Sequence, residues 1–374
     1  MSRPRIALAD AFADLPDPRV DRTKKHLLSD ILVIAVCAVV AGADSFEEVE
    51  RFGRAKHGWL KRFLALPNGV PSHDTFNRVL AALDRRAFAA CFSQWMAALC
   101  PAAGLRPVAI DGKAVRAAAQ DTFSGCLHLV TAWAGANRLV LGQEAVAGGS
   151  NEIAAIPGLL AVLELKGALV TIDAAGCQVE IARAIRAKKG HYLLAVKGNQ
   201  PALGAAVQAA FDAAGAADFA GVRSDFHEAV EDGHGRHEER RVTVLYDPPG
   251  LPAEWPAVAA VVQVDRERQV GGRNVGTTHY YITSYAGRAK TLGRFARGHW
   301  GIENGLHWVL DVAFREDANR TRGANAGANL GLVRRLAASL LKQSPDKGSI
   351  RAKRLNAALD DSYLFKVLQA LQAI

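Results

Sequence analysis

The order of short apolar segments between residues 107 and 199 most constrains the fold of this chain. Three strand-like segments come first, followed by two helix-like segments that alternate with two further strands. In order, the segments are 107–113, 126–134, 138–147, 151–165, 168–176, 178–190 and 191–199. Successive strands usually form hairpins, whereas strands separated by a helix pair in parallel. The pattern predicts an α/β sheet that is antiparallel at its start and parallel in the remainder.

Helix-like sequence precedes this central pattern. From Leu27 to about Leu99, apolar residues recur every three or four positions, which predicts helices. The polar positions of the later helices include Thr75, Arg78, Arg85 and Arg86. The sequence therefore fits two interpretations: a helix-turn-helix that reads DNA, or a helical domain that only packs against the rest of the protein.

A second β-rich pattern follows the central one. Between about 222 and 285 we expect three strands, the last two joined by the Gly-rich hairpin GGRNVG. Long helices are expected again from Thr291 onward. The β-rich segment therefore looks like an insertion into the α/β part.

Basic residues exceed acidic ones, with 46 Lys plus Arg against 37 Asp plus Glu, and almost all of the excess lies near the C-terminus. Between Ala318 and Arg354, one acid, Asp346, accompanies nine basic residues. Such a cluster is typical of a phosphate-binding surface, although a solvated helix face has the same composition. The nine are Arg320, Arg322, Arg334, Arg335, Lys342, Lys347, Arg351, Lys353 and Arg354.

The cysteine and targeting patterns favour a cytoplasmic protein. The five cysteines are odd in number and include no Cys-x-x-Cys pair, so neither a disulfide framework nor a thiolate zinc site is indicated. The most apolar run, 31–43, is shorter than the roughly 20 residues that cross a bilayer, and we expect a buried helix there. The N-terminus lacks an apolar signal core. We expect a cytoplasmic, nucleoid-associated protein without membrane contact.

Two aspartates stand at the ends of predicted strands. Asp111 follows the apolar run PVAI, and Asp173 follows ALVTI. Ligands of α/β sheets bind at the carboxyl ends of strands, and two carboxylates there repel each other unless a cation lies between them. Mg²⁺ prefers such oxygen ligands. The alternative is that each aspartate merely begins a turn.

A third acid lies in the segment RGHWGIENGLHWVLDV. On an α-helix, His299, Glu303, His307 and Asp311 follow at intervals of four and share one face, as an ordinary surface stripe would too. We expect apolar residues on the other faces to pack on the sheet and turn Glu303 toward the two aspartates. These are Trp300, Ile302, Leu306, Val309, Leu310 and Ala313. A zinc protease is disfavoured because the His-Glu-x-x-His spacing is absent.

Several strings resemble the ISAs branch of the IS-four-type DDE transposases. They are IDGK around Asp111, VTIDAAGCQVEIARAI around Asp173, YLLAVKGNQ, and HWGIENGLHWVLDVAFRED around Glu303. The N-terminal strings LPDPRV and GVPSHDTFNRVL resemble the region associated with that family, so the resemblance covers nearly the whole chain. It implies a ribonuclease-H-like mixed sheet with a β-rich insertion, preceded by a helical N-terminal domain.

The resemblance also implies the activity, which is metal-dependent cleavage and transfer of DNA strands at the ends of an insertion sequence. Asp111, Asp173 and Glu303 would be the catalytic triad and the ligands of two Mg²⁺ ions, for which Mn²⁺ would substitute. The partners would be double-stranded DNA, as terminal inverted repeats and target, and a second copy of the chain in a homodimer on DNA. The expected DNA contacts are Lys113, Lys197, Arg297, His299, His307, Arg320, Arg322, Arg334 and Arg335.

Three parts follow from this resemblance. Residues 1–100 would form the helical, DNA-binding N-terminal domain. Residues 101–345 would form the catalytic domain, with the insertion at about 222–285, and residues 346–374 would form a basic helical tail. The Tyr, Arg and Lys that flank the last acid in the broader superfamily fall here on Ala296, His299 and Leu310. His299 and His307 are therefore candidates to replace them as phosphate or end contacts.

Other classes of protein remain open. A catalytically inactive or domesticated DNA-binding protein of the same family would bind DNA with strong salt dependence and without metal. Exposed, solvated side chains are the alternative for Lys113 and Lys197. A glycoside hydrolase would account for Asp111 and Asp173, but it leaves the basic C-terminal segment unexplained.

Overall fold

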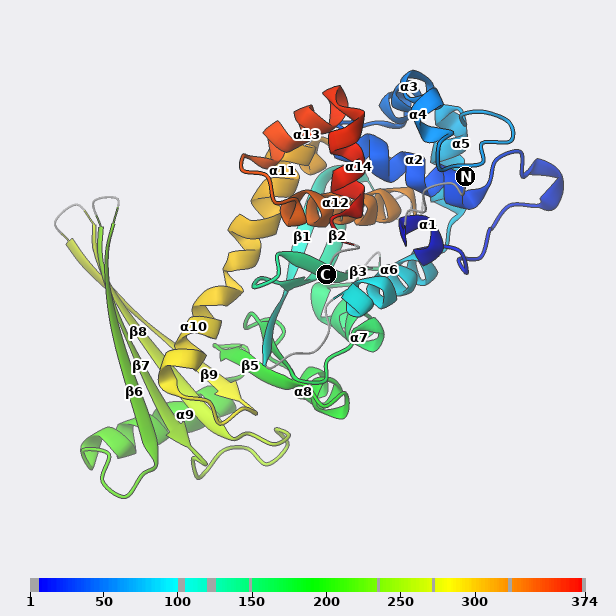
Figure 1. Ribbon diagram of the computed structural model, residues 1–374. Coiled ribbons are helices and arrows are strands. Elements are labelled where there is room, and N and C mark those ends of the chain that lie inside the picture. The colour runs from blue at the N-terminus through cyan, green and yellow to red at the C-terminus, as the bar shows by residue number, and fades with distance from the viewer. Residues whose placement is uncertain are drawn as a thin grey trace. The chain divides into compact units, whose positions relative to one another are not determined.

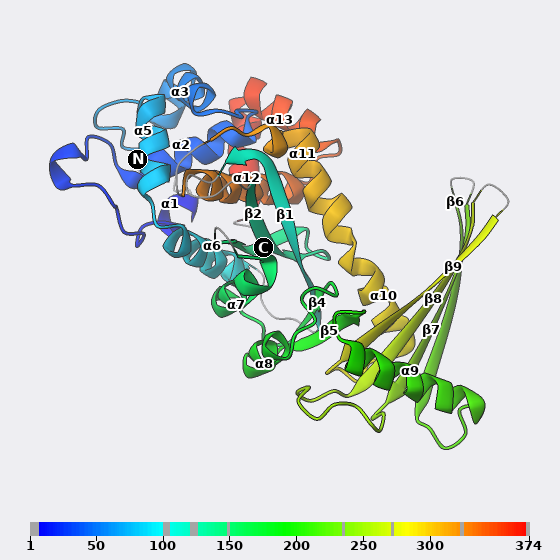
Figure 2. The ribbon, with the colours of Figure 1, turned by 180° about the vertical axis from the view of Figure 1, so that it is seen from behind.

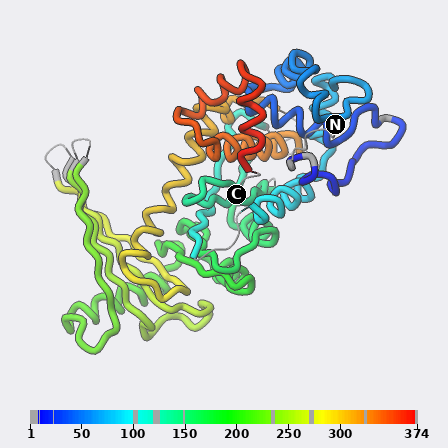
Figure 3. The backbone as a smooth tube through the Cα atoms, in the orientation of Figure 1, coloured from blue at the N-terminus to red at the C-terminus, as the bar shows by residue number. Residues whose placement is uncertain are grey.

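The computed structural model describes residues 7–99, 105–119, 126–147, 150–233, 236–270, 273–321 and 325–371. The chain divides into two compact units. Unit 1 comprises residues 1–101, 112–163 and 302–374, and unit 2 comprises residues 102–111 and 164–301. Within unit 1, helices from the beginning and the end of the chain lie side by side, drawn in blue and red (Figure 3).

Unit 1 is mainly helical (Figure 1). Its α-helices are α1 (Ala7–Ala11), α2 (Leu28–Val40), α3 (Phe46–Ala55), α4 (His57–Leu60), α5 (His73–Ala82), α6 (Arg85–Leu99), α7 (Glu152–Val162), α11 (Trp308–Phe314), α12 (Ala326–Gln343), α13 (Ile350–Leu359) and α14 (Asp361–Gln369). Short 3-10 helices, η1 (Asp21–Thr23) and η3 (Glu316–Ala318), and a π-helix, η2 (Glu303–His307), complete the helical elements.

Two long buried helices, α2 and α12, form the centre of unit 1 and pack against each other. All residues of α2 except Ser29 are buried, which confirms the buried helix predicted from the apolar run. A helix that is apolar on every side is stable only where other elements surround it. The helices α13 and α14, which lie in the expected C-terminal tail, pack against α12 and α2 within the same unit.

The strands of unit 1 form one side of the sheet. The strands β2 (Cys126–Ala134) and β3 (Leu139–Ala145) are antiparallel, and β1 (Arg106–Ala119) lies beside β2. The strand β1 is longer than the predicted segment 107–113, and it contributes its first residues to unit 2 and its later residues to unit 1.

The described residues of unit 2 form a mixed sheet and three helices (Figure 2). Its strands lie in the order β1-β4-β5-β9-β8-β7-β6. The strands β1, β4 and β5 are parallel, and the remaining neighbours are antiparallel. The new elements are β4 (Ala168–Ile172), α8 (Val179–Ala187), β5 (His191–Val196), α9 (Pro201–Ala216), β6 (Ser224–Gly233), β7 (Arg236–Tyr246), β8 (Ala260–Val270), β9 (Arg273–Thr283) and α10 (Ala289–His299).

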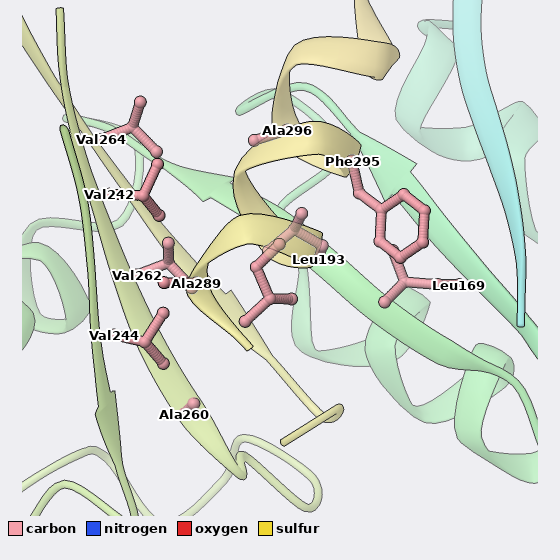
Figure 4. Close-up of a cluster of buried hydrophobic side chains, with 11 residues drawn as sticks. Leu169, Leu193, Val242, Val244, Ala260, Val262, Val264, Ala289, Phe295 and Ala296 are labelled. Carbon is pink, nitrogen blue, oxygen red and sulfur yellow. The ribbon is translucent and has the colours of Figure 1, made fainter. Parts of the chain in front are cut away.

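The helix α10 carries an apolar face that packs on unit 2's sheet. Leu292 and Phe295 are buried among side chains of β4, β5, β7 and β8, including Leu169 and Val242 (Figure 4). A side chain at Gly293 would not fit, because its Cβ would lie 2.6 Å from a methyl carbon of Val242. The glycine therefore permits the close approach of α10 to β7.

The predicted order of elements and the fold class are confirmed: a ribonuclease-H-like mixed sheet with a β-rich insertion and a helical N-terminal region. The predicted number of strands in the insertion was wrong, because its described residues form four strands, β6 to β9, where three were expected. The additional strand, β6, lies at the edge of the sheet and has few apolar residues, so its sequence lacks the pattern of a buried strand. In the described part of the chain, no helix is both long and apolar enough to span a membrane.

Candidate active site

The parallel pairing of β1 and β4 aligns the two candidate aspartates in unit 2. Ile110 is the register partner of Ile172, and the next residues along the two strands are Asp111 and Asp173. Neighbouring strands lie about 4.8 Å apart, and residues in register point to the same face of the sheet. The expectation that Asp111 ends a strand was wrong, because β1 continues to Ala119. The two aspartates instead follow the last paired residues of β1 and β4, so the backbone still places them side by side.

The last turn of α10 lies against the strand that ends in Asp173. Thr171 Oγ1 lies 3.1 Å from His299 Nδ1, and both residues are buried. Burial lowers the pKa of His299, although Asp173 and the contact with Thr171 act in the opposite direction. The imidazole is therefore neutral at neutral pH, so a contact with phosphate would rely on a hydrogen bond rather than on charge.

A small cavity of about 70 Å³ opens beside Asp173. Its wall includes Lys197, which is exposed, together with His279, His299 and Trp300. The position of Lys197 next to Asp173 suits the expected contact with phosphate. Trp300 is 57% exposed, so the expectation that it packs on the sheet was wrong.

The loop after Asp173 is fixed by hydrogen bonds that the sequence analysis missed. Gly176 N donates to Asp173 Oδ1 at 3.2 Å, so this aspartate also begins a turn. From the loop after β5, Asn199 Nδ2 donates to Ala174 O at 2.7 Å, and Gln200 Nε2 donates to Cys177 O at 2.9 Å. The Asn-Gln pair of the string YLLAVKGNQ thus positions the loop that carries Asp173.

In unit 1, Glu303 begins the π-helix η2 rather than continuing an α-helix. The helical face that His299, Glu303, His307 and Asp311 were expected to share is therefore interrupted at Glu303. The Glu303 side chain is 51% exposed, and its Oε2 lies 3.5 Å from Nδ1 of the buried His307. Single π-turns within helices occur frequently at functional sites, since they change which side chains share a face.

Lys113 is neither solvated nor open to phosphate in unit 1. Its Nζ lies 2.8 Å from Asp311 Oδ1, 2.8 Å from Asp317 Oδ1 and 3.9 Å from Glu316 Oε2. Burial lowers the pKa of Lys113, but its hydrogen bonds to Asp311 and Asp317 and the charge of Glu316 raise it above its ordinary value overall. The ammonium therefore serves as the cation of an internal acidic cluster.

Arg334 and Arg335 are also internal, on the central helix α12. Arg335 Nη1 donates to Glu316 Oε1 at 2.7 Å, and its Nε donates to Thr131 Oγ1 at 3.0 Å. Arg334 Nη2 donates to Asp44 O at 3.2 Å. Both guanidinium groups are buried, which argues against the expected contacts with DNA.

Other basic residues of the C-terminal segment are buried as well. Lys353 Nζ donates to the carbonyl oxygens of Leu341 and Ser344, and Arg354 pairs with Asp44. The positive charge of this segment therefore does not form one phosphate-binding surface, contrary to the prediction. Sequence counts charges but does not show which of them pair inside the fold.

The remaining candidates for DNA contacts lie in different environments. Arg297 is exposed in unit 2 and makes two hydrogen bonds to Glu231, one of them 2.6 Å from Nη2 to Oε2. Arg320 is exposed in unit 1, and Arg322 lies outside the described residues. Burial and the charges of Arg335 and Lys113 lower the pKa of His307 to about 3, so this ring is neutral at neutral pH.

Comparison with known proteins defines the class of protein. Residues 102–341 match the model described as "Transposase DDE domain", and residues 9–96 match the one described as "DDE_Tnp_1-associated". The chain is 39% identical over 373 residues to "Putative transposase YncI" of Escherichia coli O157:H7, covering 97% of this chain and 94% of that one. It is 34% identical over 371 residues to "H repeat-associated putative transposase YhhI" of Escherichia coli K12, covering 96% and 97%. The class is that of the transposases, and the chain belongs to the transposase DDE domain family.

Two further matches extend the comparison. The chain is 42% identical over 283 residues to "Uncharacterized protein in dhlA 3'region" of Xanthobacter autotrophicus, which covers 73% of this chain and 93% of that one. Among solved structures, the piggyBac transposase synaptic complex with hairpin DNA matches with a TM-score of 0.41 and 10% identity. That match covers 96% of this chain and 77% of the other.

Proposed function

We propose that this chain is the DNA transposase of an insertion sequence, which cuts the ends of the element and joins them to target DNA by two-metal phosphoryl transfer. The observation that carries the proposal is the register of β1 and β4, which aligns Asp111 with Asp173 at the point where the parallel pairing of the two strands ends. Membership in the transposase DDE domain family gives this pair of acids its chemical context.

Asp111, Asp173 and Glu303 would hold the metal ions. Carboxylate oxygens are the ligands that Mg²⁺ prefers and that Mn²⁺ accepts, so the donor set fits these ions. When bound, two such ions activate the attacking hydroxyl and stabilise the leaving oxygen of an in-line displacement. The half-exposed carboxylate of Glu303 is open to solvent.

The neighbouring side chains have supporting roles in this proposal. The neutral imidazole of His299 is fixed by Thr171 beside the strand that carries Asp173. The exposed ammonium of Lys197 would contact a phosphate of the DNA strand at the same cavity. The partners are the terminal inverted repeats and the target duplex, and the joining of two ends favours a homodimer on DNA in the cytoplasm.

Cleavage of a labelled duplex that carries the element's own end tests the function. In Mg²⁺ we expect nicking at the end, and EDTA abolishes it. Asp173→Asn and Glu303→Gln each lower the rate at least about a hundredfold, because the loss of a metal ligand removes several kcal/mol of transition-state stabilisation.

Glu254→Gln is the matched control and leaves the rate unchanged, since this glutamate is exposed in the loop between β7 and β8 and does not line the cavity beside Asp173. Cleavage that persists in both active-site variants would refute the assignment. Binding of the duplex without any cleavage in Mg²⁺ or Mn²⁺ would instead support the inactive DNA-binding alternative.

A further inference from the structure

The strands β6–β9 of the insertion continue well beyond α10 (Figures 1 and 2). The outer half of this sheet comprises residues 228–233, 236–241, 265–270 and 273–278 in the described part of the chain. Successive residues of a strand point to opposite faces. The register of the strands therefore assigns each charged residue to one face.

The two faces of the outer half differ in charge. One face has a single described basic side chain, Arg241, and five acidic ones. The acids of this face are Glu228, Asp232, Glu239, Asp265 and Glu267. Two of its ion pairs, from Arg241 to Glu228 and to Glu239, confirm that these residues share a face. This acidic face would repel a polyanion.

The opposite face carries Arg240, Arg266 and Arg268 around one carboxylate. All three arginines contact Glu238, at 2.7 Å for Arg266 and 2.8 Å for Arg268. One carboxylate neutralises only one of three guanidinium groups, so positive charge remains. Glu231 lies on the same face and contacts Arg297, which shows that this face looks toward α10.

The helix α10 adds three cations to this basic face. Lys290, Arg294 and Arg297 follow at intervals of four and three, so they share one side of the helix, and all three are exposed. Together with Arg240 and Ala229, they line a cleft of about 260 Å³ between α10 and the insertion. We call it the α10 cleft, and its single lining carboxylate is Glu231.

We propose that the α10 cleft and the adjoining basic face bind the sugar-phosphate backbone of duplex DNA. This inference rests on the proposed function, because it takes DNA to be the substrate. The argument is charge complementarity: among the described side chains of the α10 cleft and the basic face, six basic ones accompany two carboxylates, and the acidic face excludes the polyanion. Cations that contact phosphates release counterions and give affinity that depends on salt and not on sequence.

Loss of positive charge in the cleft provides the first test. Binding of a random-sequence duplex is measured in EDTA, at several salt concentrations, for the full chain and for Lys290→Gln/Arg294→Gln. Each lost phosphate contact lowers affinity roughly eightfold at 0.1 M salt and reduces the salt slope by about 0.9. Arg241→Gln, which removes one positive charge from the acidic face of the same sheet, is the control for each lost charge and leaves both quantities unchanged.

Removal of a negative charge provides a second test, in which the affinity for the duplex is expected to rise. Glu231→Gln frees Arg297 for phosphate, so affinity rises several-fold, whereas Arg297→Gln lowers it. Glu239→Gln, on the acidic face, is the matched control and does not change affinity measurably. An ion pair with a structural role alone would predict that Glu231→Gln and Arg297→Gln act in the same direction.

These outcomes separate this inference from the proposed function. If the parent chain cleaves DNA in a metal-dependent way but Lys290→Gln/Arg294→Gln binds the duplex as tightly as the parent, the proposal for the α10 cleft is refuted. The transposase assignment is then unaffected. Absence of cleavage together with the predicted losses of affinity would refute the catalytic assignment alone. Thermal unfolding of each variant confirms that it is folded before binding is compared.

Discussion

The hydroxyl of Thr171 lies 3.1 Å from Nδ1 of His299, so the strand that ends in Asp173 is joined directly to the last turn of α10. Thr171→Val replaces this hydroxyl with a methyl group of similar volume and leaves a buried ring nitrogen without its partner. We expect a loss of stability of about 1–3 kcal/mol, measured by urea unfolding.

Thr171→Ser is the matched control, because it keeps the hydroxyl and removes the methyl group. If the hydrogen bond is responsible, Ser retains most of the stability that Val loses. A loss in Ser as large as that in Val would contradict this, because Ser keeps the hydroxyl. A loss in Ser alone would assign the stability to packing of the methyl group, which Val retains.

Lys113 holds together the acidic cluster of unit 1. Lys113→Met leaves Asp311, Asp317 and Glu316 near one another without their shared cation. Breaking a buried ion pair costs about 3–5 kcal/mol, and since Asp311 and Asp317 are partly exposed, we expect about 2–3 kcal/mol in urea unfolding. The variant Asp317→Asn in the Lys113→Met background should recover part of this loss, and a purely additive result would argue against a direct interaction.

Arg335 and Glu316 form a fully buried ion pair, with both side chains 0% exposed. Arg335→Met leaves the carboxylate of Glu316 without this partner, so we expect a loss of about 3–5 kcal/mol by chemical unfolding. The double variant Arg335→Met/Glu316→Leu should restore much of the stability. Arg351→Met, at an exposed position of α13, is the control and should stay within about 0.5 kcal/mol of the parent.

The contrast between Arg335 and Arg320 shows what sequence could and could not predict. Both belong to the basic segment that we interpreted as a phosphate-binding surface, yet only Arg320 is exposed. The partner of Arg335 is Glu316, and the helix α12 that carries Arg335 is buried by elements far apart in the sequence. Local charge density therefore predicts the number of cations but not their environment.

The order of strands and helices was predictable because each buried strand around Asp111 and Asp173 has its own apolar run. The strand β6 was missed because an edge strand needs few apolar residues, and its acids Glu228, Glu231 and Asp232 are exposed. The π-helix at Glu303 was missed because spacing alone assumes a regular α-helix. The alignment of Asp111 with Asp173 followed from the rule for parallel strands and needed no side-chain information.

The thiol of Cys177 should be unreactive in the folded protein. Burial, together with the nearby charge of Asp173, raises the pKa of Cys177 to about 12. The thiolate is the reactive form, and only about 0.1% of this thiol is ionised at pH 9, whereas a solvent-exposed cysteine is mostly ionised there. At pH 9 the partly exposed Cys126 should be alkylated far faster than the buried Cys177, as measured by peptide mass spectrometry. Comparable rates at the two sites in the native protein would contradict the burial.

Two glycines of the same helix, Gly293 and Gly298, should respond to alanine in opposite directions. A Cβ at Gly293 would lie 2.6 Å from a methyl carbon of Val242, whereas a Cβ at Gly298 meets no atom within 4 Å. Gly293→Ala should therefore cost about 1–3 kcal/mol through overpacking, and it should also weaken duplex binding, because α10 moves away from β7 at the α10 cleft.

Gly298→Ala should instead leave stability unchanged or raise it by up to about 1 kcal/mol, since alanine is the better helix former. Val242→Ala in the Gly293→Ala background makes room for the new methyl group, so part of the lost stability and of the duplex affinity should return. Urea unfolding and duplex binding of the three variants measure both effects. If Gly293→Ala is as stable as Gly298→Ala, α10 does not depend on this close contact for its place on the insertion.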